Sequence, residues 1–571
     1  MKRKSTFYTI LATILTFTFI FYACSSDDGS EVSSPTLSTS STSISFAPIQ
    51  GGSVSAPRSA TITGARLTQT VSISISGAFE ISKDNTNYSS NLSFTATEAN
   101  QANTISVRFT PAEEDLGELT GTITITSNEF ETIQISLSGE ALEIQREIQV
   151  IGAINPFGEV TVGNMSAVQT VQLKGLNLQN DVVATASAPF EISKDNVNFS
   201  ASVTYDYTAI NTTPENLYVR FSPTATDLGA IVGDITLVAP EVSDDVIALS
   251  GTGVSVRHNY QTFQNQRIAF GGGFSQTVTN TYNLHNNMSN IEQIMMYVQL
   301  RCPTGGCNAW DVYANIKVKD NASGEFYEIG RYITPYGVDN SQLARGFEID
   351  VTDFKSLLQG STELYARIET WGSDGWELSV EFDYVEGTPD YEYYAIADVI
   401  TYDDWSTSGV PYGVTNDPTV WDLTKTVSIP ANAEATHLRT IISGWGHATP
   451  VDSDNRPCAE WCFRTHDVKI NGATAFQHAM QPMGCASNPV QPQSGNWTPD
   501  RAGWCPGMAV PVRVDQFTTP MNGNTFMFEY DYQDWTSDGG TTSGQGGAFY
   551  ATSTFVVVKS STPITKPVVT D

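Results

Sequence analysis

The first half of the chain repeats itself, and this repeat restricts the half to a tandem arrangement of two similar units. The seven residues FEISKDN at 79–85 recur at 190–196, and the triplet LSG at 137–139 recurs at 249–251. The spacing between the copies is about 112 residues in both cases, which is the length of one small domain. We therefore expect two copies of one fold, one after the other.

Short runs of alternating apolar and polar residues fill each copy, as in VSISIS at 71–76 and GTITIT at 121–126. Alternation with a period of two indicates β-strands, and the Gly, Pro and Asn residues between the runs indicate turns. We expect two immunoglobulin-like β-sandwiches, at 44–142 and 143–254, because each copy has the length of one such sandwich. The repeated motifs also resemble bacterial immunoglobulin-like modules that end in an LSG strand. Sandwiches serve as stalks and as binding surfaces, so both roles stay open for this pair.

The N-terminus carries an export signal. Basic residues 2–4 precede an apolar run at 7–22, and this run ends at Ala23-Cys24. The run is too short for a transmembrane helix, which needs about 20 apolar residues. A basic segment, a short apolar segment and a small residue before a cleavage point form a signal peptide, here at 1–23.

Cys24 at the cleavage point resembles the lipid-attachment cysteine of bacterial lipoproteins, and the alternative is an ordinary signal peptide with an incidental cysteine. The following SSDD at 25–28 resembles the acidic tag that directs some Gram-negative lipoproteins to the outer surface. We expect an exported protein that is lipid-anchored through Cys24 to the outer membrane, at the cell surface. The Ser- and Thr-rich segment 24–43 is typical of a tether that leaves the membrane.

The chain has 571 residues, which is too long for one hydrophobic core, since single cores stop growing near about 250–300 residues. Acidic residues outnumber basic ones by 61 to 29, and the net charge is -32. A surface this acidic repels phosphate backbones, so the charge argues against nucleic acid as a partner. The simplest role of the charge is to keep an extracellular protein soluble, and we expect a monomer.

Beyond residue 253 the composition changes, because the six remaining cysteines and the Trp-rich segments at 371–376 and 445–461 lie there. An even number of cysteines in an exported chain indicates disulfides. Six cysteines permit 15 pairings. The local spacing favours three pairs: Cys302–Cys307, Cys458–Cys462 and Cys485–Cys505. The alternative is a zinc site, but no two histidines have the spacing of a zinc-binding pair, so we expect no metal.

Three carboxylates stand out in this second half. Asp311 follows the first cysteine pair, on the polar face of an expected strand at 310–318. Glu369 shares the face of another expected strand with Trp371, which suits a polar pocket with an aromatic wall. Glu460 lies inside CAEWC, where a disulfide would fix the direction of its side chain. The simpler interpretation of each acid alone is a solvated surface carboxylate.

Motifs of several other enzyme classes are missing. The sequence has no His-Glu-x-x-His metalloprotease motif, no Gly-x-Ser-x-Gly nucleophile elbow and no phosphate-binding loop. Acid–base chemistry by carboxylates on a carbohydrate-linked substrate therefore remains the leading interpretation of the residues themselves.

Long motifs span both halves of the region after residue 275: WD at 310–311, YEIGR at 327–331, ITPY at 333–336, EIDVTDFKSLL at 348–358, SGWGHA at 443–448, CAEWCFRTH at 458–466 and PDRAGWCPGMAV at 499–510. In these motifs the chain resembles the peptide-N-glycosidase F family of bacterial peptide-N4-(N-acetyl-β-glucosaminyl)asparagine amidases. The resemblance implies two antiparallel jelly-roll β-sandwiches side by side, with the active site in the cleft between them. The turn signal GTPD at 387–390 predicts the boundary between the two, at 255–388 and 389–571.

The resemblance implies a role for each matching residue. Asp311 matches the family's primary catalytic acid, Glu460 the second essential carboxylate and Glu369 a supporting one. Six further residues match the lining of the cleft: Trp371, Trp445, His447, Trp461, Arg501 and Trp504. The three cysteine pairs favoured by spacing agree with the family's disulfides, and the implied chemistry needs no cofactor.

The implied reaction is hydrolysis of the asparagine side-chain amide in N-linked glycoproteins and glycopeptides, which leaves aspartate and releases a glycosylamine. The sequence departs from the family next to Asp311. Asn308 and Ala309 stand where members carry acidic residues, and Val312 stands where they carry an arginine that helps to hold the sugar core. The alternatives are a glycosidase of the endo-β-N-acetylglucosaminidase type, which cuts between the two core sugars, and a non-catalytic glycan-binding surface lipoprotein.

Overall fold

The computed structural model describes residues 34–411, 423–537 and 547–571. Within these ranges the chain is built almost wholly of β-strands, most of them antiparallel, so the prediction of an all-β protein is confirmed. The helical segments are short: α1 (Ala96–Ala99), α2 (Tyr207–Thr212), η1 (Thr352–Phe354), η2 (Ser406–Ser408) and η4 (Cys485–Ser487). The expected signal peptide at 1–23 and Cys24 lie outside the described residues. No helix in the described ranges has the length and apolar character needed to cross a membrane.

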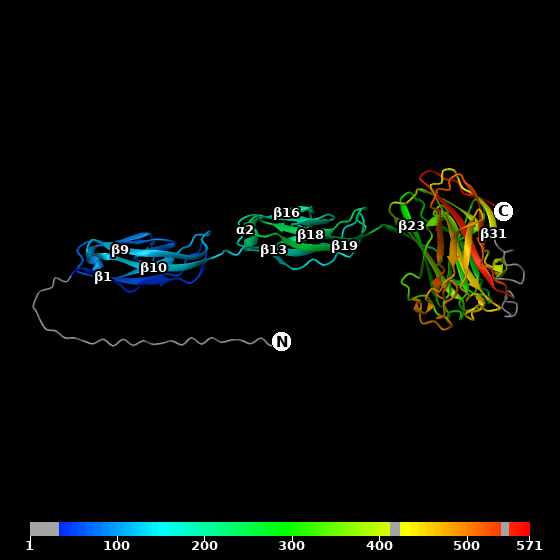
Figure 1. The fold of residues 1–571 in the computed structure, drawn as a ribbon, viewed down its shortest axis with the longest axis horizontal. Helices are drawn as coiled ribbons and strands as arrows, with labels where there is room; N and C mark the ends of the chain where they lie inside the picture. Colours follow the sequence, from blue (N-terminus) through cyan, green and yellow to red (C-terminus); the bar gives the residue numbers. More distant parts are fainter. Residues whose placement is uncertain (1–33, 412–422, 538–546) are drawn as a thin grey trace, which may run out of the picture.

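Figure 1 shows three bodies in a row, the first two slender and the third broader. One sheet of the first body has the strand order β1 (Thr36–Thr39), β4 (Arg58–Ala65), β8 (Ala102–Phe109), β6 (Phe79–Ser82). The other has the order β2 (Ser43–Ser45), β10 (Phe130–Leu142), β9 (Gly117–Ser127), β5 (Val71–Ile75), β7 (Asn91–Phe94), and β3 (Ile49–Gln50) also pairs with β10. In β5 the residues alternate strictly between buried and exposed, as the sequence pattern predicts.

The second body repeats this plan. Its first sheet has the order β11 (Glu147–Ile151), β13 (Gln169–Leu176), β17 (Glu215–Phe221), β15 (Phe190–Ser193). Its second sheet has the order β12 (Glu159–Thr161), β19 (Asp245–Val254), β18 (Gly229–Val238), β14 (Val182–Ala186), β16 (Ser202–Tyr205). Each slender body has a hydrophobic core of its own, so the sequence repeat is also a repeat of packing.

Two glycines explain why the LSG motif recurs. A Cβ on Gly139 would lie 2.7 Å from the Phe109 ring, and a Cβ on Gly251 would lie 2.7 Å from the Phe221 ring. Each of these rings pairs with the phenylalanine that begins the FEISKDN motif of its own body, at centroid distances of 5.0 and 5.1 Å. Any larger residue at the glycine position would displace an aromatic ring from a close-packed core.

The tether expected at 24–43 is shorter than the sequence suggests. Residues Thr36–Thr39 form β1, which pairs antiparallel with β4, and Leu37 is buried between the sheets. The composition concealed this strand because only one of its residues faces the core, while the Ser and Thr residues around it face solvent.

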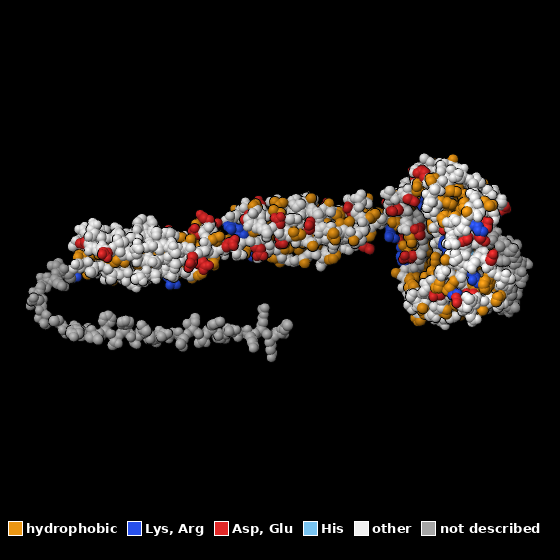
Figure 2. Space-filling view, viewed as in Figure 1, with side chains coloured by type: hydrophobic (Ala, Val, Ile, Leu, Met, Phe, Trp, Pro, Cys, Tyr) orange, Lys and Arg blue, Asp and Glu red, His pale blue; other side chains and the backbone are white. Residues whose placement is uncertain are grey.

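The two slender bodies touch through polar side chains. Gln179 Nε2 donates to Glu113 Oε2 at 3.0 Å, and an Arg146 nitrogen lies 3.7 Å from the same carboxylate. Figure 2 shows basic and acidic side chains together where these bodies meet. Exposed pairs of this kind contribute at most about 1 kcal/mol each, so the contact between the bodies is weak.

The first half of the third body contains two sheets. One has the order β20 (Arg257–Gln261), β28 (Trp376–Glu386), β23 (Ile291–Arg301), β26 (Phe347–Asp350), with β21 (Gln266–Ile268) also on β28. The other has the order β22 (Thr277–Asn283), β27 (Ser361–Ile368), β24 (Tyr313–Lys319), β25 (Phe326–Ile333), β37 (Met508–Ala509). The last of these strands comes from the second half of the region, so the two halves share a sheet.

The second half of the third body is built in the same way. One sheet has the order β29 (Tyr393–Ile400), β40 (Phe549–Ser560), β32 (Ala435–Trp445), β38 (Val512–Gln516), with β30 (Val410–Pro411) also on β40. The other has the order β36 (Ala473–Ala479), β35 (Thr465–Ile470), β39 (Thr525–Asp531), β31 (Leu423–Ser428), β41 (Val568–Thr570). A small ribbon, β33 (His447–Ala448) with β34 (Cys458–Ala459), extends from the end of β32.

A buried seam joins the two halves. Phe555 of β40 packs into the hydrophobic core of the first half. Beside it, Arg331 pairs with Glu328, donates to Ser443 Oγ at 2.9 Å and donates to the Ala551 carbonyl at 2.6 Å. Burial alone would raise the pKa of Glu328, but the charge and hydrogen bonds of Arg331 hold it below its usual value. The interface between the two halves therefore contains a fully buried ion pair as well as apolar contacts.

Candidate active site

Asp311 lies in the loop just before β24. The sequence predicts a strand at 310–318, whereas β24 begins at Tyr313. The alternating sequence pattern begins before the paired strand does, because the Val312 N–H donates to the Thr334 hydroxyl at 2.9 Å and not to a neighbouring strand. The Asp311 side chain is consequently held at the edge of a sheet, where it is mostly buried.

Glu460 lies in the loop that the Cys458–Cys462 disulfide closes. Its N–H donates to the Gly446 carbonyl at 3.2 Å, and its own carbonyl accepts the Ala502 N–H at 2.9 Å. The backbone on either side of the carboxylate is therefore tied to two other loops. This is the pre-positioning that the sequence suggested for Glu460.

Arg501 joins these two acids. Its side chain is fully buried, with Nη2 at 3.3 Å from Asp311 Oδ2 and Nε at 3.4 Å from Glu460 Oε1. Its Nη1 and Nη2 donate to the carbonyls of Pro499 and Asn496, at 2.8 and 2.7 Å. One guanidinium thus brings together carboxylates from both halves of the third body, in a geometry that a rigid planar cation suits.

The protonation of Asp311 follows from these surroundings. Burial raises the pKa of Asp311 to about 7, and the charge of Glu460 adds to the rise. The charge of Arg501 and a hydrogen bond with Tyr336 oppose it. A carboxyl group with a pKa near neutrality can take up and release a proton at physiological pH, which is what a general base requires.

His447 and Trp461 surround the far side of Glu460. His447 Nε2 lies 3.3 Å from Glu460 Oε2 and 3.1 Å from Trp461 Nε1. A neutral Nε2 accepts the indole N–H, whereas a protonated Nε2 donates to the carboxylate. The hydrogen bond to Glu460 raises the pKa of His447, so the carboxylate favours the charged imidazole. The Trp461 ring also lies 4.3 Å from the Arg501 guanidinium.

Two tryptophans stack behind this cluster. The rings of Trp445 and Trp504 lie 4.8 Å apart at an angle of 25°. Trp504 is 1% exposed and donates its indole N–H to the Gly444 carbonyl at 3.0 Å. The sequence comparison placed Trp504 in the lining of the cleft, but a ring with so little exposed surface supports Trp445 and does not itself form a wall. Trp371, by contrast, is 62% exposed, on the loop that follows β27.

Comparison with known proteins shows the family to which the chain belongs. The family model described as "Peptide-N-glycosidase F, C terminal" matches residues 416–556. The peptide-N(4)-(N-acetyl-beta-D-glucosaminyl)asparagine amidase F of Elizabethkingia miricola is 49% identical over 336 residues, which are 58% of this chain and 93% of the relative. The chain belongs to the peptide-N-glycosidase F family.

Solved structures of this family match the fold as well. A structure of peptide-N-glycosidase F, a glycosylasparaginase from Flavobacterium meningosepticum, has a TM-score of 0.53 at 51% identity and covers 55% of this chain and 100% of that chain. A crystal structure of a peptide-N(4)-(N-acetyl-beta-D-glucosaminyl)asparagine amidase has a TM-score of 0.52 at 50% identity, with 55% and 100% covered. These relatives account for little more than half of the present chain.

The third predicted acid, Glu369, does not share the cation that joins the other two. Among the ion pairs of the described residues, Arg501 pairs with Asp311 and Glu460 and not with Glu369. Glu369 follows β27, and its N–H donates to the Tyr313 carbonyl at 2.9 Å. Burial raises the pKa of Glu369 to about 7, and the charge of Arg367 opposes the rise. Its position suits a supporting role.

The three departures from the peptide-N-glycosidase F pattern have separate surroundings. Asn308 is buried, and its Nδ2 donates to Asp374 Oδ1 at 2.7 Å. Ala309 is exposed. Val312 is half-buried against the hydrophobic core of the first half. The amide of Asn308 therefore fastens the loop of Asp311 to the loop that carries Trp371.

Tyr336 is a residue of the site that the sequence did not single out. Arg501 Nη2 donates to the Tyr336 hydroxyl at 3.1 Å, and Tyr336 acts to lower the pKa of Asp311. The residue was present in the ITPY motif that the chain shares with the peptide-N-glycosidase F family. One tyrosine at a strand end has no chemical pattern of its own, so nothing in the sequence marked it as a partner of Asp311.

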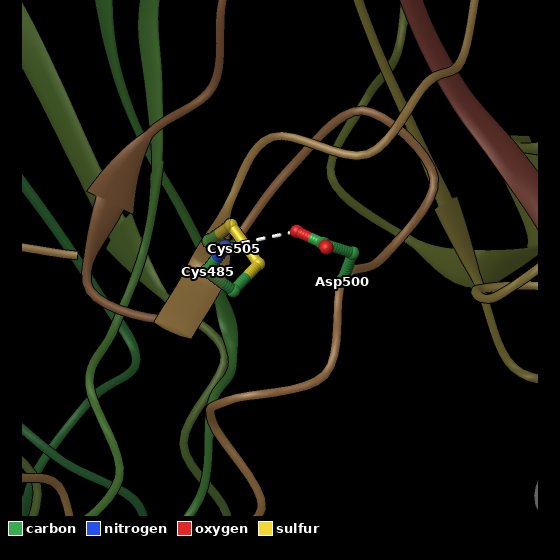
Figure 3. Close-up of side chains that lie close together, drawn as sticks. All are labelled: Cys485, Asp500 and Cys505. Carbon is green, nitrogen blue, oxygen red and sulfur yellow. Dashed lines mark hydrogen bonds between the residues drawn. A yellow bond between two sulfur atoms is a disulfide. The ribbon is translucent and has the colours of Figure 1, made fainter. Parts of the chain in front are cut away.

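Two cysteines and an aspartate lie as close together as metal ligands do: Cys485, Asp500 and Cys505, shown in Figure 3. The two cysteines are bonded to each other. Asp500 Oδ1 accepts the N–H groups of Gly484 and Cys485, at 2.6 and 2.8 Å, so this carboxylate stabilises the turn that begins η4. The structure contains all three disulfides that the spacing favours: Cys302–Cys307, Cys458–Cys462 and Cys485–Cys505.

A groove of about 1080 Å³ lies elsewhere on the third body, and none of the candidate catalytic residues lines it. Its lining includes Asp353 from the first half, and His437 and Arg439 from the second. Asp353 Oδ1 lies 3.0 Å from His437 Nε2, and Arg439 Nη1 donates to Asp353 Oδ2 at 3.2 Å. Burial alone would raise the pKa of Asp353, but His437 and the Arg439 charge hold it below its usual value. The cluster joins the two halves across the groove.

Proposed function

We propose that the chain hydrolyses the asparagine side-chain amide of N-linked glycoproteins and glycopeptides, leaving aspartate in the peptide and releasing the glycan as a glycosylamine. The proposal rests mainly on the cluster of Asp311, Glu460 and Arg501, in a chain that belongs to the peptide-N-glycosidase F family. The E. miricola relative is named as an amidase that acts on such a bond.

Asp311 acts as the general base toward a water molecule that attacks the amide carbon. Its pKa of about 7 is high enough for it to accept the proton and low enough for it to be ionised above neutral pH. Glu460, with His447 and Arg501 beside it, orients the amide and the first sugar and stabilises the charge that develops in the transition state. The chemistry uses side chains alone and needs no cofactor.

Sugar binding falls to the aromatic side chains around these acids. Trp371, Trp445 and Trp461 hold the first two N-acetylglucosamine rings by apolar contact. Glu369 supports this part of the site, and we assign it a contact to sugar and not to the amide because it does not pair with Arg501.

The remaining assignments are proposals of the same kind. We propose immunoglobulin-like folds for the two slender bodies, at 44–142 and 143–254, and jelly-roll folds for the halves 255–388 and 389–571. The slender bodies act as a stalk that carries the enzyme on a lipid anchor at Cys24. The protein is then a monomer on the outer membrane, at the cell surface.

The test is to incubate the pure protein with a denatured N-glycoprotein and to measure the masses of the tryptic peptides by mass spectrometry. An amidase converts the glycosylated asparagine into aspartate and removes every sugar. A peptide that keeps one N-acetylglucosamine would instead indicate a glycosidase of the endo-β-N-acetylglucosaminidase type. An unchanged glycopeptide that the protein nevertheless binds would indicate a non-catalytic glycan-binding protein, and either result would contradict the proposal.

A further inference from the structure

Two phenylalanines are exposed next to the candidate site. Phe270 and Phe274 are 45% and 46% exposed, and every other phenylalanine in the described ranges is buried or half-buried. They flank three glycines, residues 271–273, with φ angles of 75°, 62° and 91°. Glycine adopts such positive φ angles readily, whereas other residues do so only at an energetic cost. The Phe274 N–H donates to the Gly271 carbonyl at 3.0 Å, so the loop reverses tightly between the two rings.

This loop is attached to the loop that carries Trp371. The rings of Phe270 and Trp371 meet edge to face at 5.1 Å, and the Phe270 N–H donates to the Gly372 carbonyl at 2.9 Å. Arg267 Nη2 donates to the Ser373 carbonyl at 2.7 Å. The three exposed rings therefore belong to one connected surface, which we call the aromatic rim: Phe270, Phe274 and Trp371.

The aromatic rim is also fixed relative to Asp311. Asn308, three residues before Asp311, donates its side-chain amide to Asp374 Oδ1 at 2.7 Å and its N–H to the Gly375 carbonyl at 3.2 Å. The loop of Trp371 thus lies between the loop of Asp311 and the glycine loop. Phe270 and Phe274 stand one loop further from the reacting bond than Trp371 does.

We propose that Phe270 and Phe274 bind sugar units of the glycan beyond the first two, as a continuation of the surface formed by Trp371. The proposal rests on the proposed function, in which the first two sugars contact Trp371. Large exposed apolar surface of this kind marks an interaction site. The flat rings offer apolar faces to the C–H groups of sugars, and the hydrogen bonds between the loops pre-organise these faces, which reduces the entropy lost on binding.

The position of the rim decides which part of the substrate it meets. Asp311 and Glu460 act at the bond between asparagine and the first sugar. A surface that extends from Trp371 away from Asp311 is reached by the outer part of the glycan. The polypeptide, which leaves the bond on the other side of the amide, does not extend along the sugars.

The test compares two glycopeptides with the same peptide sequence. One bears only the first two N-acetylglucosamine units, and the other bears a complete branched glycan. Phe270→Ala and Phe274→Ala should each lower kcat/KM for the complete glycan about fivefold, with a larger loss in the double variant. Phe274→Ala should leave kcat/KM for the two-sugar substrate within twofold of wild type. As a control, Met527→Ala removes an exposed apolar side chain from β39 of the second half and should change kcat/KM for neither substrate.

Two other outcomes would overturn the proposal. An equal loss on both substrates, with an unchanged melting temperature, would assign the rim to the peptide or to the first sugars. Unchanged rates on both substrates would leave the rim without a role in glycan binding. If an alanine variant does not fold, Phe270→Leu and Phe274→Leu keep the apolar volume but remove the flat face, and the same selective loss is expected. Wild-type protein that cleaves neither substrate would contradict the proposed function itself.

Discussion

Asp311 and Glu460 are two carboxylates that share one buried cation. Without Arg501 they would be two negative charges brought together in a mostly buried site, where like charges disfavour ionisation. With Arg501 both can approach the same amide while one of them keeps a pKa near neutrality. This arrangement fits the proposed roles of Asp311 as the general base and of Glu460 as the residue that stabilises the transition state.

Replacing the base should abolish catalysis and spare binding. Asp311→Asn keeps the shape of the side chain but removes its ability to accept a proton, so kcat should fall by a factor of about 10²–10⁴. Glycopeptide affinity, measured by calorimetry, should change little. Kinetics on one fluorescent N-glycopeptide would give the rates.

Two matched variants separate the roles of the acids. Glu460→Gln should be about as severe as Asp311→Asn, and Glu369→Gln should be milder, because Glu369 does not pair with Arg501. Wild-type rates in folded Asp311→Asn would refute the proposed mechanism.

The pH dependence should follow the ionisation of Asp311. The base acts as a carboxylate, and its pKa is raised to about 7, so the active form is fully present above pH 8 and is lost as the pH falls through 7. We expect log(kcat/KM) to rise with unit slope between about pH 5 and 6.5 and to level off above about pH 8. The ionisation of Glu369, whose pKa is also raised to about 7, steepens the acid limb if this charge is needed too. A rate that is flat from pH 5 to 8 would contradict the assignment of Asp311 as the base.

At the scale of single elements, the acids depend on the loops that hold them. Glu460 sits in a five-residue loop closed by Cys458 and Cys462, and the loop is fastened to two neighbours by backbone hydrogen bonds. Opening the disulfide should therefore disturb the direction of the carboxylate before it disturbs the fold.

The double variant Cys458→Ser with Cys462→Ser tests this dependence. Turnover should fall at least tenfold, while the melting temperature falls by only a few degrees, because a short closed loop contributes about 2–4 kcal/mol or less. The companion variant replaces Cys302 and Cys307 by Ser, which opens the disulfide loop just before Asp311 and shows whether that acid depends on its neighbouring bridge in the same way. A folded Cys458/Cys462 variant with normal turnover would show that the loop is held without its disulfide.

The strands were predictable from the sequence because alternation reports which residues face a core. The VSISIS run became β5, in which burial alternates, whereas residues 313–318 of β24 are all buried because Asn315 and Lys317 contact the second half. The pattern failed at the ends of strands, where the contact of a single side chain determines whether the strand continues. Burial of Leu37 places β1 inside the expected tether, and the hydrogen bond of Thr334 to Val312 replaces strand pairing just after Asp311. Contacts between loops, such as those of Tyr336 and Asn308, depend on the tertiary fold and could not be read from local sequence.

The identities of the three acids came from the resemblance to the peptide-N-glycosidase F family, since each acid alone is indistinguishable from a surface carboxylate. The sequence could not order their pKa values, which depend on burial and on Arg501. It also could not distinguish an exposed tryptophan such as Trp371 from a buried one such as Trp504, because both match the same set of family residues.

At the scale of the whole molecule, the three bodies have separate cores. The slender bodies touch each other through exposed polar side chains, and their cores contain no residue of the third body. A fragment that begins near Arg257, where β20 joins the third body, should therefore fold and cleave glycopeptide at the rate of the full chain within about twofold. A fragment with a cooperative melt but no activity would show that the slender bodies take part in catalysis.

The contact between the two halves of the third body should be sensitive to one charge. Asp353 is paired with His437 and Arg439 across the groove, so Asp353→Asn leaves a buried guanidinium without its counter-ion. Loss of one partner of a buried pair costs about 3–5 kcal/mol, and the free energy of unfolding should fall accordingly. Urea denaturation would measure the loss, and Glu325→Gln, at an exposed position, should have no effect. A loss below about 1 kcal/mol would indicate that solvent reaches the cluster.

The seam around Arg331 also limits how the molecule can move. Rotating one half against the other would break the hydrogen bonds from Arg331 to Ser443 and Ala551 and would pull Phe555 out of the hydrophobic core of the first half, at a cost far above thermal energy. The two halves are therefore held in a fixed arrangement around Asp311, Glu460 and Arg501. We expect the flexibility that brings a glycosylated asparagine to these residues to come from the substrate. We therefore expect glycans on loose loops and unfolded chains to be released faster than glycans on rigid surfaces, and the rates on a folded and a denatured form of one N-glycoprotein would measure the difference.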